Sequence, residues 1–143
     1  MTFRPYSKEQ SLKGTSKKIR YRCSDGTMVT QDTIDRKRRE VYRTMMERSR
    51  CSAYPWEMAN DHDHTISQAR CKKLGKTELI WDTNNIELTC REAHKEWESY
   101  RSGIFETHDN IIRRMLYVKK HDPENFEKRY QCLSNYRIMK ELK

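Results

Sequence analysis

The stretch from residue 57 to residue 101 constrains the fold more than any other, because its pattern changes three times in a fixed order. It opens with the alternating acid and imidazole groups of residues 61–64, which a short strand can carry. Residues 65–83 are polar and basic and are typical of a long loop. Residues 85–89 alternate as a second strand does, and residues 91–101 have the spacing of a helix. The predicted order is therefore strand, long loop, strand and helix.

The segment before this stretch predicts a hairpin followed by a helix. Residues 18–30 alternate in polarity around Asp25-Gly26, a dipeptide that favours a tight turn. Asp32 or Thr33 can cap the helix that follows. The apolar stripe of this helix is predicted to be core and consists of Ile34, Val41, Tyr42, Met45 and Met46.

The segment after the central stretch predicts further helices. A stripe from Ile111 to Leu116 has helical spacing, and Asp122-Pro123 supplies a cap and a first-turn proline for another helix. The basic residues here could add phosphate contacts, but most of them are expected on solvated faces: Arg113, Arg114, Lys119, Lys120, Lys128 and Arg129.

The chain as a whole is predicted to be α+β, with a small strand-strand-helix core in a mainly helical chain and a short N-terminal β-hairpin. Its 143 residues suit one domain. Residues 1–50 would form a basic arm, the hairpin and a helix, residues 51–101 the core, and residues 102–143 a helical extension packed on the core. Residues 1–17 lack periodicity and are interpreted as a flexible basic arm.

The charge of the chain predicts a polyanionic partner. The net charge is +9 and the pI is near 9.4, so the surface raises the local concentration of phosphates. Nucleic acid is the first candidate and an anionic membrane the second. Residues 1–60 carry 14 Lys or Arg against 7 Asp or Glu, which places the docking region there. The candidate DNA-binding residues lie on the first predicted helix and in the long loop: Arg36, Lys37, Arg38, Arg39, Arg43, Arg70, Lys72, Lys73 and Lys76.

The sequence contains neither a membrane-span pattern nor a secretion pattern. No apolar run approaches the roughly 20 residues needed to cross a bilayer, and the N-terminal residues lack the apolar region of a signal peptide. We therefore expect a cytoplasmic protein with no membrane partner. The cysteines are odd in number and widely scattered, which favours reduced thiols: Cys23, Cys51, Cys71, Cys90 and Cys132.

The two ends of the central stretch hold the groups needed for one divalent cation beside an activated water. Asp61 is a hard ligand suited to Mg²⁺ or Mn²⁺, and His94 adds one imidazole while leaving positions open for water and phosphate oxygens. His62 can be neutral and accept a proton from water. Adjacent strand residues point to opposite faces, so Asp61 and His62 need either a bulge or an approach from opposite sides of a phosphate.

Three more polar residues of the stretch are candidates for supporting roles. The amide of Asn85 can hydrogen-bond across the fold to the backbone near His62 and so hold the imidazole. His64 and Asp63 are auxiliary candidates, either as ligands or as phosphate contacts, with exposed polar groups as the alternative, and His64 is ranked first. His108 and His121 lie outside this set and are expected at the surface.

These residues resemble the signatures of the His-Asn-His endonucleases, the ββα-metal nucleases. Asp61-His62, Asn85 and His94 match the three signatures, and the nine-residue step from Asn85 to His94 is similar to the usual spacing of the family. The doubled Asp-His-Asp-His motif is also similar to phage recombination endonucleases of the endonuclease VII type. The resemblance covers roughly residues 51–97, about a third of the chain.

The resemblance implies a ββα-metal core and a metal-dependent DNA endonuclease. His62 would be the general base and Asn85 its support, with one Mg²⁺ or Mn²⁺ on Asp61 and His94. The products from double-stranded DNA would carry 5′-phosphate and 3′-hydroxyl ends, and a phage or mobile-element origin is inferred by analogy. A non-catalytic nucleic-acid-binding protein and a dimeric junction-resolving endonuclease stay open as alternatives, as does the choice between monomer and homodimer.

Many members of this family carry a structural zinc ion between two Cys-x-x-Cys pairs. Here Cys51 and Cys90 keep the first cysteine of each pair, while Tyr54 and Ala93 replace the second. Two thiolates cannot complete a tetrahedral site, so no structural zinc is expected unless Cys71 and a histidine complete it. Aromatic side chains are expected to pack in its place: Tyr54, Trp56 and Trp97.

Overall fold

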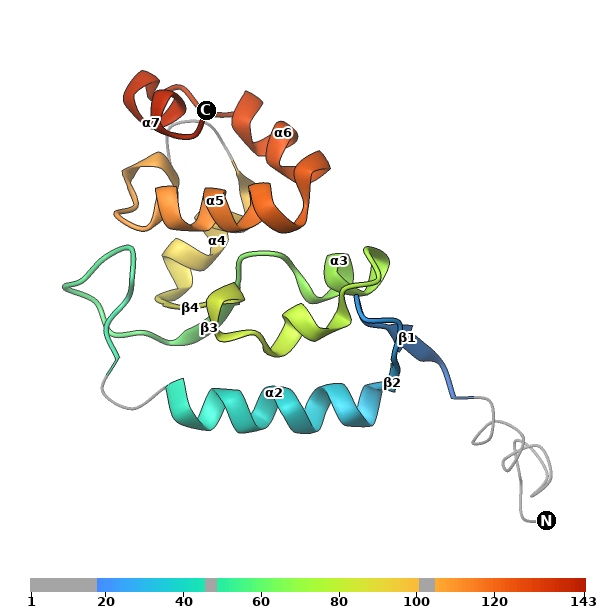
Figure 1. The fold of residues 1–143 in the computed structure, drawn as a ribbon. Helices are drawn as coiled ribbons and strands as arrows, with labels where there is room; N and C mark the ends of the chain where they lie inside the picture. The colour runs from blue at the N-terminus through green and yellow to red at the C-terminus, as the bar shows by residue number, and fades with distance from the viewer. Residues whose placement is uncertain (1–17, 46–48, 101–104) are drawn as a thin grey trace, which may run out of the picture.

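The computed structural model covers the whole chain and describes residues 18–45, 49–100 and 105–143. These residues form a mainly helical arrangement with two small antiparallel sheets, β1–β2 and β3–β4 (Figure 1). This confirms the α+β class. The basic arm predicted at residues 1–17 lies outside the described ranges. None of the described helices is long and apolar enough to cross a membrane.

The N-terminal hairpin is present as predicted. Strand β1 (Arg20–Arg22) pairs antiparallel with β2 (Met28–Thr30). Gly26 takes a φ of 90°, a left-handed conformation that glycine adopts without strain, and its amide donates to the carbonyl of Cys23. The Asp25-Gly26 dipeptide therefore makes the turn that its composition favours.

Helix α2 (Gln31–Met45) follows the hairpin directly. It begins slightly earlier than expected, because the hydroxyl of Thr30 accepts a hydrogen bond from the Thr33 amide at 3.4 Å. Ile34 is completely buried, whereas Tyr42 and Met45 are only half-buried. Met46 lies outside the described residues, and the described part of the predicted apolar stripe contacts the core mainly at its N-terminal end.

The central stretch contains the predicted strands and helix. Strand β3 (Asp61–His64) pairs antiparallel with β4 (Ile86–Thr89) in continuous register, from Asp61 opposite Thr89 to His64 opposite Ile86. No bulge interrupts β3. Helix α4 (Arg91–Ser99) packs against both strands, and α2 lies on the other side of the hairpin (Figure 1). The β3–β4 pair therefore lies between helices from different parts of the chain.

The segment between β3 and β4 is not the extended loop that was predicted. It forms helix α3 (Gln68–Lys73) and two 3-10 helices, η1 (Thr77–Trp81) and η2 (Thr83–Asn85). Apolar residues spaced along it enter the main core: Ile66, Cys71, Leu79 and Ile80. Because the segment is rich in lysine and arginine, its contribution to the core was not predicted.

The C-terminal part consists of η3 (Phe105–Thr107), α5 (Ile111–His121), α6 (Pro123–Gln131) and α7 (Tyr136–Glu141). The Asp122 side chain caps α6 by accepting from the Asn125 amide, as expected. The expectation of solvated basic faces is wrong at Arg114 and Arg129. Both side chains are buried, and their guanidinium groups lie 4.1 and 3.9 Å from the ring centre of Trp97.

Candidate functional site

Strand β3 presents two chemically different faces. Because β3 is regular, alternate side chains point in opposite directions. Asp61 and Asp63 point toward His94 of α4, and we call these three residues the acidic face. His62 and His64 point toward Tyr42 of α2, and we call these two histidines the imidazole face.

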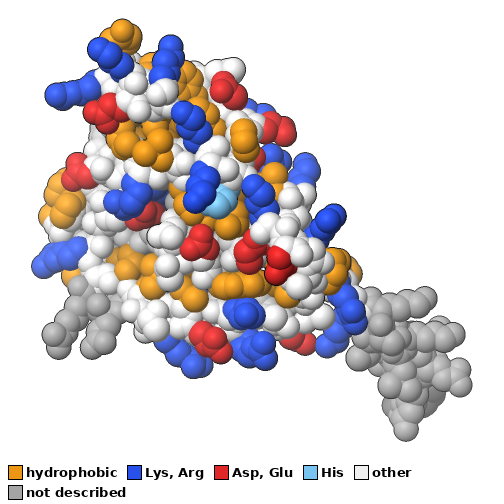
Figure 2. Space-filling model, in the orientation of Figure 1, with side chains coloured by type: hydrophobic (Ala, Val, Ile, Leu, Met, Phe, Trp, Pro, Cys, Tyr) orange, Lys and Arg blue, Asp and Glu red, His pale blue; other side chains and the backbone are white. Residues whose placement is uncertain are grey.

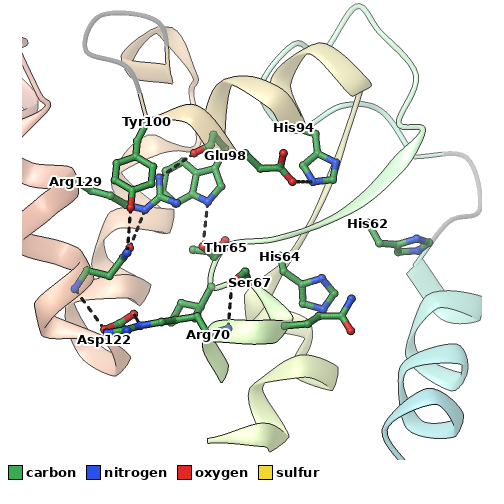
Figure 3. A pocket seen from close by; sticks show the side chains of 14 residues that line it. His62, His64, Thr65, Ser67, Arg70, His94, Glu98, Tyr100, Asp122 and Arg129 are labelled. Carbon is green, nitrogen blue, oxygen red and sulfur yellow. Dashed lines mark hydrogen bonds and ion pairs between the residues drawn. The ribbon is translucent and has the colours of Figure 1, made fainter. Parts of the chain in front are cut away.

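The acidic face is built around the His94 ring. Nδ1 of His94 lies 3.1 Å from Oδ2 of Asp61, and Nε2 lies 3.5 Å from Oδ1 of Asp63. Glu98, one helical turn further along α4, places Oε1 3.0 Å from the same Nε2 (Figure 3). Asp61 also accepts from Arg91 at 3.2 Å. His94 is therefore surrounded by three carboxylates.

The two aspartates of this face differ in their electrostatics. Burial raises the pKa of Asp61, but hydrogen bonds from His94 and Arg91 outweigh it, so this pKa lies below its ordinary value. Asp63 is only 1% exposed, and burial raises its pKa although the charge of Arg114 acts in the opposite direction. Asp61 is thus the more readily ionised of the two.

Asp63 is tied to the C-terminal helices. Its Oδ2 accepts from Nη1 of Arg114 at 3.0 Å, and both side chains are almost completely buried. Nε of Arg114 donates to the Thr65 hydroxyl at 3.0 Å. In the described part of the chain, Oδ1 of Asp63 has no hydrogen-bond partner, and this free oxygen is the one that faces His94.

The imidazole face is held in a different way. The ring of His62 stacks on the ring of Tyr42, with centroids 3.8 Å apart and planes 9° from parallel. His64 lies in a tilted arrangement with the same tyrosine, and its Nε2 donates to the carbonyl of Ile80 at 2.8 Å. Burial lowers the pKa of His62 below its ordinary value and lowers that of His64 to about 4. Both imidazoles are therefore neutral at pH 7.

The two faces meet at the surface of the molecule. One cavity of about 460 Å³ is lined by His62 and His64 as well as by His94 and Glu98 (Figure 3). A second cavity, of about 490 Å³, is lined by Asp61, His62 and His94. A group bound here can therefore contact both the acidic face and His62, which is possible without any bulge in β3.

Asn85 is buried, and its amide makes cross-fold hydrogen bonds. Oδ1 accepts from the Ile66 amide at 2.7 Å, while Nδ2 donates to the carbonyls of Ile66 and Leu79 at 3.0 and 2.9 Å. The expected partner was the backbone beside His62, but these bonds hold the chain just after β3 instead. Asn85 therefore supports β3 at its C-terminal end.

The candidate DNA-binding residues fall into two groups. Arg70 makes a two-pronged ion pair with Asp122, while Lys72 donates to Gln31 and Lys76 donates to the carbonyl of His121. On α2, Arg38 donates to Gln68 and the amino group of Lys37 lies 5.2 Å from the Trp81 ring centre. Within the described ranges, four exposed side chains make no ion pair or hydrogen bond: Arg36, Arg39, Arg43 and Lys73.

Cys51 and Cys90 lie together in a small apolar cluster with Ala53, Ala93 and Tyr54. Sγ of Cys51 accepts from the Tyr54 amide at 3.2 Å. Only Tyr54 of the three expected aromatics packs here, because Trp56 is 71% exposed and Trp97 belongs to the main core. Cys71 is also in the main core, apart from this cluster. The expectation that no zinc binds here stays a prediction.

Several residues of the site were missed or misplaced on the sequence alone. Tyr42 was assigned to the core stripe of α2, although it meets His62. Arg114 was expected in solvent, although it binds Asp63. His108 was expected at the surface, but it is buried and pairs with Glu96 at 2.5 Å, while His121 is half-buried against Tyr117. For Tyr42, Arg114 and His108 the partner comes from another element, and one-dimensional periodicity carries no signal for it, whereas Tyr117 lies four residues before His121 on α5.

Comparisons of the chain with protein-family models, with curated proteins and with solved structures returned no match. In the described part of the chain, no set of three or more His, Cys, Asp or Glu side chains is arranged to hold a metal ion by itself. Asp61 and His94 are two such groups in contact, and an ion bound between them would leave positions open for water and phosphate oxygens.

Proposed function

We propose that this protein is a metal-dependent DNA endonuclease with a ββα-metal core formed by β3, β4 and α4. The observation that carries the proposal is the meeting of Asp61, His94 and His62 around one cavity. This arrangement supplies a hard anionic ligand, an imidazole ligand and a neutral base within a single site. These are the protein groups required for hydrolysis of a phosphodiester.

The acidic face has a donor set that suits Mg²⁺ or Mn²⁺. The 3.1 Å between Oδ2 of Asp61 and Nδ1 of His94 is close to the distance of about 3 Å between neighbouring ligands of an octahedral Mg²⁺. Oδ1 of Asp63, which has no partner in the described residues, adds negative charge beside the same ring. When bound by Asp61 and His94, the cation would neutralise charge that develops on the phosphate.

The imidazole face supplies the base. His62 is neutral at pH 7 because burial lowers its pKa, so it can take the proton of an attacking water. It reaches the shared cavity from the strand face opposite Asp61. The base and the metal ligands therefore approach a phosphate from different sides, which is one of the two arrangements that a regular strand permits.

The charge of α2 supports DNA as the substrate. Arg36, Arg39 and Arg43 are exposed and lie on one stripe of the helix, at roughly 60 to 120° around the axis from Tyr42. Figure 2 shows Lys and Arg side chains along the lower edge of the molecule, where Figure 1 places α2. Exposed cations beside the candidate base, without an ion pair among the described residues, are suited to binding phosphate groups.

The test is cleavage of supercoiled plasmid by the unmodified protein and by His62→Ala, with Mg²⁺, with Mn²⁺ and with chelator. We expect metal-dependent nicking by the unmodified protein and a loss of roughly 10²- to 10⁴-fold in His62→Ala, because general-base catalysis contributes about this much. His121→Ala, a histidine outside both cavities that contain His62, is the matched control and should cleave normally.

Two results would contradict the proposal. Equal nicking by His62→Ala and the unmodified protein would remove His62 as the base. Salt-sensitive DNA binding with no cleavage in any metal would identify a non-catalytic binding protein instead.

A further inference from the structure

A tyrosine outside the β3–β4–α4 unit stacks almost in parallel on an imidazole ring of the site. Tyr42, on α2, stacks on His62 with a centroid separation of 3.8 Å and an angle of 9° between the ring planes. The two residues belong to elements separated by the segment that joins α2 to β3. The contact is therefore a tertiary one and not a local consequence of the strand.

The His62 ring needs such a contact to hold one orientation. The χ2 torsion of histidine has a broad, roughly two-fold preference, so the rotamer alone does not set the plane of the ring. In the described part of the chain, Nε2 of His62 is buried without a hydrogen-bond partner, while the backbone of Tyr42 interacts with the imidazole and acts to raise its pKa. His64, the neighbouring imidazole on the same face, is instead held by its hydrogen bond to Ile80.

The packing of Tyr42 does not account for the contact. Tyr42 is only half-buried, and the completely buried residue of α2 is Ile34 near the other end of the helix. Tyr42 is also absent from the residues of the two apolar clusters. A tyrosine that covers an imidazole rather than the apolar core has its main effect on that imidazole.

We propose that Tyr42 is a positioning residue for His62: its ring fixes the plane of the imidazole so that His62 meets the water that attacks the phosphate. This inference rests on the proposed function. It also makes α2 a necessary part of the active site, since the helix that carries the exposed Arg39 and Arg43 is the one that orients the base. Tyr42 itself need not touch the substrate.

The experiment compares Tyr42→Phe, Tyr42→Leu and Tyr42→Ala with the unmodified full-length chain. Phe keeps the stacked ring, Leu keeps apolar bulk without a ring, and Ala removes both. Val41→Ala, the adjacent half-buried residue of α2, is the control for general damage to the helix. Plasmid cleavage at saturating protein gives the rate of the chemical step, and DNA binding in chelator gives the affinity separately.

We expect the cleavage rate to fall on the order of 10- to 100-fold in Tyr42→Ala and Tyr42→Leu, with DNA affinity within about twofold, because misplacing a catalytic group slows chemistry and not binding. Tyr42→Phe should restore the rate. The ring protons of His62, assigned by comparison with His62→Ala, should be shifted upfield by the stacked ring in the unmodified protein and in Tyr42→Phe. They should move downfield in the Leu and Ala variants.

Three results would overturn the inference. If the unmodified protein cleaves and Tyr42→Leu cleaves as fast, Tyr42 does not position the base, although the proposed function stands. If Tyr42→Phe is as slow as Tyr42→Ala, the hydroxyl rather than the stacked ring is responsible. If the unmodified protein fails to cleave with either metal, the proposed function fails and the role of Tyr42 in it fails too.

Discussion

The two faces of β3 carry similar numbers of titratable groups but are held by different forces. On the acidic face, Asp63 is locked by a buried ion pair with Arg114, and His94 is surrounded by carboxylates. On the imidazole face, His62 is held by a stacked ring and His64 by one carbonyl. Charge holds the first face and neutral packing holds the second. A four-residue strand can therefore provide both an anionic site and an uncharged base.

Breaking the acidic face should have the largest effect on stability. Arg114→Met leaves the buried Asp63 without its cation, and an uncompensated buried charge costs about 3–5 kcal/mol. We expect the free energy of unfolding, measured by urea denaturation at pH 7, to fall by about this amount. Lys128→Met is the control, because Lys128 and Glu124 are 64% and 71% exposed in their pair, so its loss should cost less than about 1 kcal/mol.

A double variant separates charge from packing in the same measurement. Asp63→Leu with Arg114→Met replaces both partners by apolar groups, so it should recover most of the stability lost in Arg114→Met. If the double variant is as unstable as Arg114→Met, the loss comes from the contacts of Arg114 with Trp97 and Thr65, and the acidic face is not held by charge.

The imidazole face should show its neutrality as a dependence of stability on pH. The pKa of His64 is lowered from 6.5 to about 4 by burial, so below pH 6.5 the unfolded chain binds a proton that the folded chain does not. Stability should therefore be complete above pH 6.5 and decline as the pH falls toward 4. Through His64 alone, the free energy of unfolding should be about 3 kcal/mol lower at pH 4 than above pH 6.5, because each pH unit below 6.5 removes up to about 1.36 kcal/mol.

The variant His64→Gln isolates this effect, because glutamine can still donate to the carbonyl of Ile80 but does not titrate. Unfolding free energies of the two proteins should run parallel above pH 7 and diverge between pH 6.5 and pH 4, with the variant declining less. Parallel curves over the whole range would mean that His64 is protonated in the folded state, which would contradict a neutral face.

The sequence predicted the parts of this site that depend on local rules. The Asp25-Gly26 turn, the alternation of β3 and β4, and the Asp122-Pro123 helix start all follow from preferences that act within a few residues. The opposite directions of Asp61 and His62 also follow from strand geometry alone. Local rules therefore place the candidate groups on their elements.

The parts that failed depend on partners far away in the chain. The helical spacing around Arg114 predicts a surface cation, because its partner Asp63 lies 51 residues earlier in the chain. The 65–83 segment reads as a loop because its few apolar residues are separated by lysines, and only the tertiary structure shows them in the core. Tyr42 fits an apolar stripe by spacing, and spacing does not show that His62 covers its ring.

The smallest expected effect concerns the surface cations beside the imidazole face. Under the proposed function, Arg39 and Arg43, which are exposed and have no ion pair among the described residues, contact phosphates, whereas Lys72 and Lys76 are hydrogen-bonded to Gln31 and to the His121 carbonyl. Two double variants with equal loss of charge compare them: Arg39→Ala with Arg43→Ala, and Lys72→Ala with Lys76→Ala.

DNA affinity is measured from 50 to 300 mM salt in chelator. Each lost phosphate contact lowers the slope of log affinity against log salt by about 0.9, so the α2 pair should lower it by roughly 2 and the lysine pair by less than about 1. Equal slopes in the two variants would show that net charge alone attracts DNA, and α2 would then have no special place beside the base.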